Sequence, residues 1–192
     1  LGLFLKAKFR LPIFNPLLIS IIAVMIFLSV FHIDYESYNV SARYLSYLLT
    51  PATVCLAVPL YQQLSLLKKH ARAILAGTVT GVLTTMATVL VLALLFQLTH
   101  EQYVTFLPKS ITTAIGMGVS EEMGGIVTIT VACIIITGII GNIIAETVCR
   151  LFHITEPVAK GIAIGSASHA IGTTKAMEMG EIEGAMSSLA IA

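Results

Sequence analysis

Charged side chains are scarce in this sequence. Asp, Glu, Lys and Arg make up 11% of the 192 residues, against roughly 25% in a typical soluble domain, while hydrophobic residues make up 57%. So few charges cannot cover the surface of a water-soluble fold of this size, and so much apolar material excludes a disordered chain. The composition therefore indicates that most of the chain lies in lipid.

Several other signatures are missing, and each absence excludes a class of function. The net charge of +1 gives no electrostatic footprint for nucleic acid. The three cysteines form no CxxC pair, and the five histidines are far apart in the sequence, so we expect no metal site. No GxxxxGK[ST] phosphate loop and no GxSxG nucleophile motif occurs. We expect a protein that is not an enzyme, with no catalytic residues and no cofactor.

Long uncharged runs are what the sequence does contain. Residues 11–33, 73–100 and 123–145 carry no Asp, Glu, Lys or Arg, and each is long enough for the roughly 20 apolar residues of a membrane-spanning helix. Residues 44–67 are equally uncharged but are interrupted by prolines. The predicted fold class is all-α, a polytopic helical membrane protein.

Three apolar stretches are too rich in Pro, Gly, Ser and Thr to be plain spans: residues 50–61, 108–125 and 161–180. In lipid every backbone N–H and C=O needs a partner, so a broken helix survives only inside protein or beside a water-filled cavity. Interrupted hydrophobic segments of this kind are the usual sequence pointer to a transporter binding site. We therefore expect broken or re-entrant helices.

Loop charges set the expected orientation. The positive-inside rule places residues 6–12 and 68–72 in the cytoplasm. If residues 108–122 enter the membrane and return, Arg150 and Lys160 also lie inside, which the rule prefers; if they span it, both lie outside. The re-entrant alternative makes the chain an inverted repeat.

The expected organisation is a single transmembrane domain, residues 1–192, cut at both ends. Its repeat halves would be residues 1–100 and 105–192. The evidence for these halves is the pattern of hydropathy and glycine placement, as in many secondary transporters.

The stretch PKSITTAIGMGVSEEMGG combines a cation, hydroxyls and acids. Lys109, Thr112 and Thr113 stand where a half-helix begins, and free N–H groups and the helix dipole attract an anion there. A buried polar cap is the alternative. Glu121 and Glu122 follow, and acids at a membrane-embedded break are candidates for proton coupling unless they simply end the segment at the aqueous surface.

The string GSASHAIGTTKA is the most informative of the chain. It places His169 among the hydroxyls of Ser166, Ser168 and Thr173 in an apolar segment. Histidine changes protonation near neutral pH, so His169 is a candidate for both substrate binding and proton coupling, although a lone His is more often structural. In TPATVCLAVPLY, flanking prolines free backbone carbonyls near Thr53, a further substrate-binding candidate, with a structural kink as the simpler account.

The chain resembles the LrgB/CidB family of bacterial membrane proteins, to which the C-terminal half of the plant plastid glycolate/glycerate translocator also belongs. The strings that carry the resemblance run in order through nearly the whole sequence: NPLLIS, TPATVCLAVPLY, LPKSITTAIGMGVSEEMGG and KGIAIGSASHAIGTTKAMEMGEIEGAMSSLA. The strings SITTAIG and GSASHAIGTTKA resemble the CidB-like branch of the family more closely than LrgB proper. The resemblance implies a multi-pass protein of the bacterial cytoplasmic membrane.

The resemblance implies two functions. One is transport of small monocarboxylates such as pyruvate, glycolate and glycerate. The other is a holin- or antiholin-like role, in which a small LrgA/CidA-type membrane partner and this protein modulate murein hydrolase export and autolysis. The residues that the shared strings carry over are Thr53, Pro108, Thr112, Thr113, Glu121, Ser166, Ser168, His169 and Thr173.

Our prediction from the sequence is a proton-coupled, alternating-access carrier of small monocarboxylates, working as a homodimer in the lipid bilayer. The alternative is the holin-like protein, which would form a wide, non-selective path. A third hypothesis is an intramembrane hydrolase built on Ser168 and His169, but nothing in the sequence points to the orienting acid or the oxyanion hole that such an enzyme needs.

Overall fold

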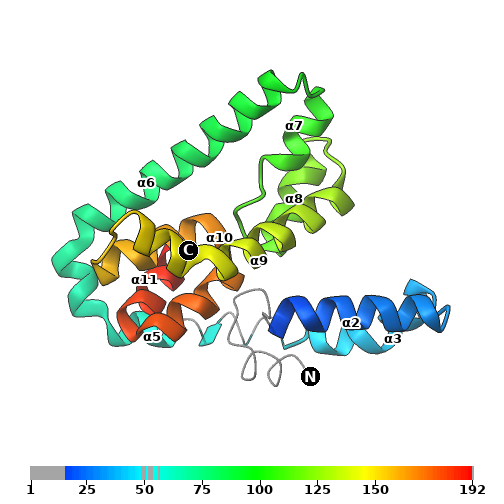
Figure 1. Ribbon diagram of the computed structural model, residues 1–192, viewed down its shortest axis with the longest axis horizontal. Coiled ribbons are helices and arrows are strands. Elements are labelled where there is room, and N and C mark those ends of the chain that lie inside the picture. The colour runs from blue at the N-terminus through cyan, green and yellow to red at the C-terminus, as the bar shows by residue number, and fades with distance from the viewer. Residues whose placement is uncertain (1–15, 49–50, 52–53, 56, 192) are drawn as a thin grey trace. The chain divides into compact units, whose positions relative to one another are not determined.

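The computed structural model describes residues 16–48, 51, 54–55 and 57–191, and these residues form helices with no strand among them (Figure 1). Residue Thr53 lies outside the described residues. The chain divides into two compact units, residues 1–58 and 59–192, which we describe separately.

The first unit contains α2 (Pro16–Val30) and α3 (Tyr35–Ser46). Pro16 stands at the first position of α2, where its missing N–H costs no hydrogen bond. The apolar part of α2, Leu18–Val30, is shorter than a typical membrane span. Asp34 caps α3 by accepting hydrogen bonds from the backbone N–H and the hydroxyl of Ser37, at 2.9 and 2.8 Å.

The second unit contains α5 (Ala57–Gln62), α6 (Leu64–Leu95), α7 (His100–Phe106), α8 (Thr113–Glu122), α9 (Val127–Leu151), α10 (Pro157–Met179) and α11 (Glu181–Ile191). Two of these helices, over Leu67–Leu95 and Val127–Leu151, are long and apolar enough to cross a membrane. At about 1.5 Å per residue, the 25 residues of α9 extend about 37 Å, beyond the roughly 30 Å of a hydrocarbon core. They match the uncharged runs 73–100 and 123–145 of the sequence.

The stretch from Pro108 to Gly125 does not form a span. Its helix, α8, has 10 residues, and at about 1.5 Å per residue it extends about 15 Å, half of a hydrocarbon core. Buried hydroxyls join α7, α8 and α9: Ser120 Oγ lies 2.7 Å from Thr130 Oγ1, which donates to the Thr105 carbonyl at 2.8 Å. Thr105 Oγ1 in turn accepts the backbone N–H of Ile126 at 2.8 Å. Helix α8 is thus a half-helix, and these hydrogen bonds hold the turn that connects it to α9.

Helix α10 is the centre of the second unit, since it contacts α6, α9 and α11 (Figure 1). One buried cluster brings Ile74 of α6 and Ile162 of α10 against Met186 of α11. A second brings Ala145 of α9 against Ile164 and Ala176 of α10. The hydrophobic core is therefore built around α10, the helix that contains the string GSASHAIGTTKA.

Candidate functional site

Helix α10 is broken at His169, so the predicted interruption within residues 161–180 is confirmed. His169 has φ 42° and ψ −146°, whereas the residues on either side are helical. Residues other than glycine rarely adopt this region of φ and ψ, because their Cβ crowds the neighbouring carbonyl. Such backbone strain persists only where the surrounding structure enforces it. The break separates a first half, residues 157–168, from a second half, residues 170–179.

The imidazole of His169 reaches across to the span α9. Its Nε2 lies 3.0 Å from the carbonyl oxygen of Ile134, and the residue is only 2% exposed. A carbonyl can only accept, so Nε2 carries the proton and Nδ1 of the neutral ring is an acceptor. Nε2 of His169 is thus held in a hydrogen bond to α9, and Nδ1 remains an acceptor for a hydrogen bond or a proton.

A recess on α9 admits the break. A Cβ built on Gly138 would lie 2.7 Å from His169 Cε1, and one on Gly141 would overlap the side chain of Ser168. Residues three apart share one face of a helix, so Gly138 and Gly141 form a continuous hollow. The predicted candidate Ser168 is therefore buried against α9, and its neighbour His169 fills the rest of the hollow.

Hydroxyl groups occupy the other side of the break. Thr173 Oγ1 donates to the His169 carbonyl at 3.1 Å and lies 2.7 Å from Ser187 Oγ of α11. Because the Thr173 proton is used on that carbonyl, Ser187 is the donor in the second bond. Both side chains are fully buried. Thr173, a predicted binding residue, thus bonds the carbonyl of the residue at the break.

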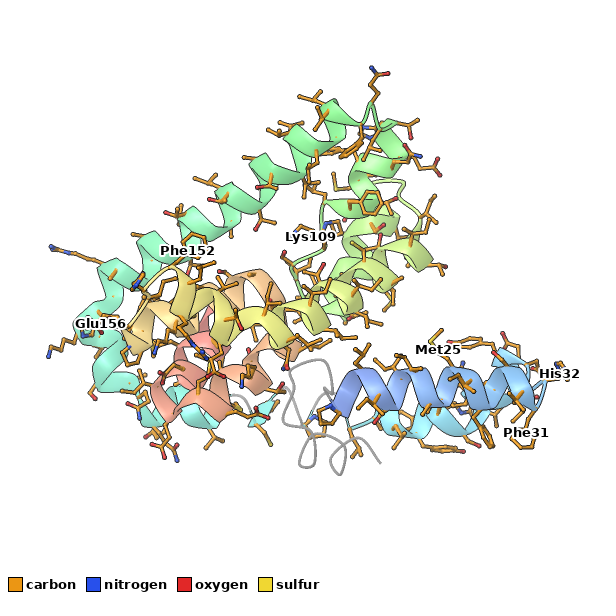
Figure 2. All side chains as sticks on the ribbon, viewed as in Figure 1. Met25, Phe31, His32, Lys109, Phe152 and Glu156 are labelled. Atoms are coloured by element: carbon orange, nitrogen blue, oxygen red, sulfur yellow. The ribbon has the colours of Figure 1, made fainter. Side chains whose placement is uncertain are left out.

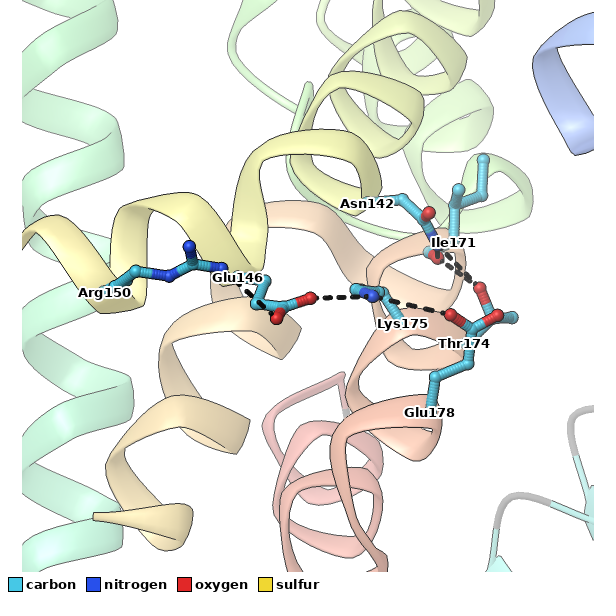
Figure 3. Close-up of polar contacts among 7 residues, drawn as sticks. All are labelled: Asn142, Glu146, Arg150, Ile171, Thr174, Lys175 and Glu178. Carbon is cyan, nitrogen blue, oxygen red and sulfur yellow. Dashed lines mark hydrogen bonds and ion pairs between the residues drawn. The ribbon is translucent and has the colours of Figure 1, made fainter. Parts of the chain in front are cut away.

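Polar side chains fix the second half of α10 to α9 (Figure 3). Asn142 Nδ2 donates to the Ile171 carbonyl and to Thr174 Oγ1, both at 2.8 Å. Lys175 Nζ lies 3.2 Å from Glu146 Oε2. The second half of α10 is therefore held to α9 by an amide and an ion pair, in addition to the apolar contact between Ala176 and Ala145.

The same network extends along each helix. Lys175 also lies 3.5 Å from Glu178 Oε2, and Arg150 lies 3.5 Å from Glu146 Oε1. Glu146 and Arg150 are four residues apart in α9, the spacing at which oppositely charged side chains of one helix meet. Arg150 is well exposed, whereas the Lys175 side chain is 20% exposed, so the Lys175–Glu146 pair is the better shielded of the two.

A cavity of about 380 Å³ lies against the first half of α10, between α6, the segment 107–111 and α11. His169 and Ser166 line it together with three further hydroxyl residues, and the other lining residues are apolar or glycine. These hydroxyl residues are Thr78, Thr85 and Ser110. A cavity of this size with a few convergent polar groups can hold a small molecule.

The cation and the hydroxyls predicted as an anion cradle are only partly brought together. Lys109, labelled in Figure 2, donates from Nζ to Ser110 Oγ at 2.9 Å, so it reaches the cavity through a lining hydroxyl. Thr112 is the N-cap of α8 and Thr113 its first residue, but neither lines the cavity. Glu121 and Glu122 are exposed at the end of α8.

Several residues of this region were not singled out from the sequence. Thr78 and Thr85 are seven residues apart, two turns of one helix face, and this spacing is the signal that could have found them. Asn142 is the one carboxamide within α9, and a polar side chain in an apolar span is expected to have a specific partner. Ser110 carries no such signal, because its place depends on the fold of the segment 107–111.

Comparison with known proteins places these features in a family. The model of the LrgB-like family matches residues 1–192. The chain is 39% identical over 185 residues to the holin-like protein CidB of Staphylococcus epidermidis, and 38% identical over 185 residues to the holin-like protein CidB of Staphylococcus aureus; each match covers 96% of this chain and 81% of the relative. It is 36% identical over 179 residues to the antiholin-like protein LrgB of Bacillus mycoides, covering 93% of this chain and 78% of the relative. No solved structure matches the chain.

The fold and the site define an all-helical protein with two helices of membrane-spanning length and a broken helix packed between them. The chain belongs to the LrgB-like family, because the family model covers it from end to end. The resemblance found in its sequence strings is confirmed.

Proposed function

We propose that this chain is a multi-pass protein of the bacterial cytoplasmic membrane with a holin- or antiholin-like role. The observation that carries the proposal is the whole-chain family match together with relatives that are named holin-like CidB and antiholin-like LrgB. In this role the protein changes the permeability of the membrane and thereby modulates murein hydrolase export and autolysis. A small LrgA/CidA-type membrane protein is its proposed partner.

The membrane placement rests on α6 and α9. Apolar side chains of α6 are exposed along its length, among them Leu83, Leu94 and Leu95, at 61%, 71% and 71%. Exposure of so much apolar surface to water is energetically unfavourable, whereas its exposure to lipid tails is not. We propose that these side chains face lipid.

Liposomes that contain the purified protein test the holin-like role. We expect release of an entrapped dye much larger than pyruvate when the protein is present with its LrgA/CidA-type partner, because a holin-like path is wide. Protein-free liposomes and liposomes with the partner alone are the controls. Retention of the dye under all these conditions would contradict the holin-like role.

A second candidate function is proton-coupled transport of a small monocarboxylate by a homodimer with inverted repeats. The observation that favours it is the strained break at His169 beside a cavity lined by hydroxyls. Discontinuous helices whose interrupted backbone lines a cavity are typical of transporter sites. In this function Nδ1 of His169 takes up the proton, and Ser110, linked to Lys109, binds the carboxylate.

Uptake of labelled pyruvate, glycolate and glycerate into tight liposomes tests the second candidate. We expect saturable uptake that rises with an inward-acidic gradient and falls at least tenfold in His169→Ala. His100→Ala removes an exposed histidine of α7 and is the matched control. Uptake that is absent, or equal in the two variants, would contradict the carrier function and leave the holin-like one in place.

A further inference from the structure

A second and larger cavity, of about 790 Å³, forms a groove between α6 and the first half of α10. Most of its lining residues are Ala, Gly, Ser or Thr, so small side chains form most of its walls. On α6 the lining residues include Ala73, Ala76, Thr80 and Thr84, and on α10 they include Ala159 and Ala163. Neighbouring helices do not cover the two walls, because Ala76, Ala159 and Ala163 remain exposed.

The groove is somewhat longer than the hydrocarbon part of one lipid leaflet. Its lining residues on α6 run from His70 to Thr85, a difference of 15 positions, or about 22 Å at about 1.5 Å per residue. Half of a hydrocarbon core is about 15 Å. A groove that begins at the membrane surface and follows α6 therefore reaches the depth that one acyl chain reaches.

Three cations stand next to His70 in the sequence, and His70 lines one end of the groove. Lys68, Lys69 and Arg72 are all exposed, and none has an ion-pair partner among the described residues. Arg72 stands one helical turn before the lining residue Ala76, and so on the same face of α6. Three unpaired cations thus lie within five residues at one end of an apolar groove.

One acid lies at the same end. Glu156, labelled in Figure 2, lines the groove and is the N-cap of α10. The three cations outnumber this single carboxylate. The field at this end of the groove is therefore positive and favours an anionic group.

We propose that the groove binds an anionic phospholipid of the cytoplasmic leaflet, with an acyl chain along α6 and α10 and the phosphate at Lys68, Lys69 and Arg72. Arginine and lysine are the side chains that bind phosphate oxygens, and anionic headgroups are attracted to cations next to a span. Another helix would fill the apolar walls equally well, but it would leave the three cations without a counter-charge. The proposal goes beyond the holin-like role and rests on α6 lying in the membrane with residues 68–72 on the cytoplasmic side.

Retained lipid measured by mass spectrometry tests the headgroup site. The detergent-solubilised protein is incubated with equal amounts of phosphatidylglycerol and phosphatidylcholine with identical acyl chains, and then washed. We expect at least fivefold enrichment of phosphatidylglycerol. Enrichment should fall to near one in a Lys68→Gln/Lys69→Gln/Arg72→Gln variant and persist in Arg43→Gln, which removes an exposed cation of the first unit. Equal retention of the two lipids by the unmodified protein would overturn the proposal.

A bulky side chain in the groove tests the acyl-chain site independently. Ala163→Phe should lower the total retained lipid at least threefold, whereas Ala132→Phe, at an exposed position of α9 outside the groove, should not. Circular dichroism establishes that both variants are folded, and Ala159→Phe, also exposed in the groove, replaces Ala163→Phe if that variant does not fold. Unchanged retention in the folded groove variant would overturn the proposal. A disulfide that joins two copies of an Ala163→Cys variant, formed with loss of the retained lipid, would also overturn it, because a second copy would then occupy the groove. No step measures permeability or uptake, so a failure here is distinct from a failure of the proposed function.

Discussion

The Nε2 atom of His169 donates to the carbonyl oxygen of Ile134 across 3.0 Å, and this bond joins the break in α10 to the span α9. It is possible because Gly138, one turn after Ile134, offers no side chain where the imidazole lies. A strained backbone, a buried donor and a glycine recess thus depend on one another. Changes in any one of them should be felt as a loss of stability or of function.

Gly138→Ala tests the recess. Its new Cβ would lie 2.7 Å from His169 Cε1 and 2.8 Å from Ile171 Cβ, and overpacking of this kind costs about 1–3 kcal/mol of unfolding free energy. Gly118→Ala is the matched control: nothing lies within 4 Å of its Cβ, so it should stabilise α8 by about 0.5–1 kcal/mol. Reversible unfolding in mixed micelles measures both. A Gly138→Ala protein as stable as the control would show that α10 does not fill the recess.

The pairing of Lys175 with Glu146 is tested by charge reversal. Lys175→Glu removes the ammonium that lies 3.2 Å from Glu146 Oε2 and places an acid beside Glu146 in a partly shielded site; we expect a loss on the order of 1–2 kcal/mol, between the values for exposed and buried pairs. The double change Glu146→Lys/Lys175→Glu should restore part of this loss in the same unfolding assay, because the swapped charges attract each other but repel Arg150 and Glu178. Arg150→Glu, at the more exposed partner, should cost less than about 1 kcal/mol. A double variant no more stable than Lys175→Glu would contradict the pairing.

Local sequence patterns predicted much of the second unit. The runs without charge gave the positions of α6 and α9, and the Gly, Ser and Thr content of residues 161–180 indicated a broken helix. These features depend on neighbours along the chain, and helical periodicity is sufficient to read them.

The point of the break and the lining of the cavity could not be predicted in this way. His169 is bonded to Ile134, 35 residues away, and Asn142 to Ile171, 29 residues away. Such partners are chosen by how α9 and α10 pack, which no local pattern encodes. The roles of the predicted binding residues in substrate recognition and proton coupling stay predictions.

The buried hydroxyl cluster of α7, α8 and α9 should be sensitive to a change that preserves shape. Thr130→Val removes the hydroxyl that bonds both Ser120 Oγ and the Thr105 carbonyl, and buried groups left without a partner cost about 1–3 kcal/mol. Thr128→Val, at an exposed position of the same helix, is the control and should be near neutral. Equal unfolding free energies for the two variants would mean that the cluster contributes nothing.

Asp34, the cap of α3, should titrate below the ordinary Asp pKa of 3.8, because the backbone N–H and then the hydroxyl of Ser37 bond its ionised form. A folded-state pKa below the unfolded value means that the cap stabilises α3 fully above pH 3.8 and that this contribution is lost as the pH falls through the folded value. The pH dependence of the Ser37 amide resonance, followed by NMR in micelles, measures the midpoint. Ser37→Ala should move it upward, since one bond to the carboxylate is removed, and Asp34→Asn should abolish the titration while keeping the cap. A midpoint at or above 3.8 in the unmodified protein would show that Asp34 does not hold these bonds in solution.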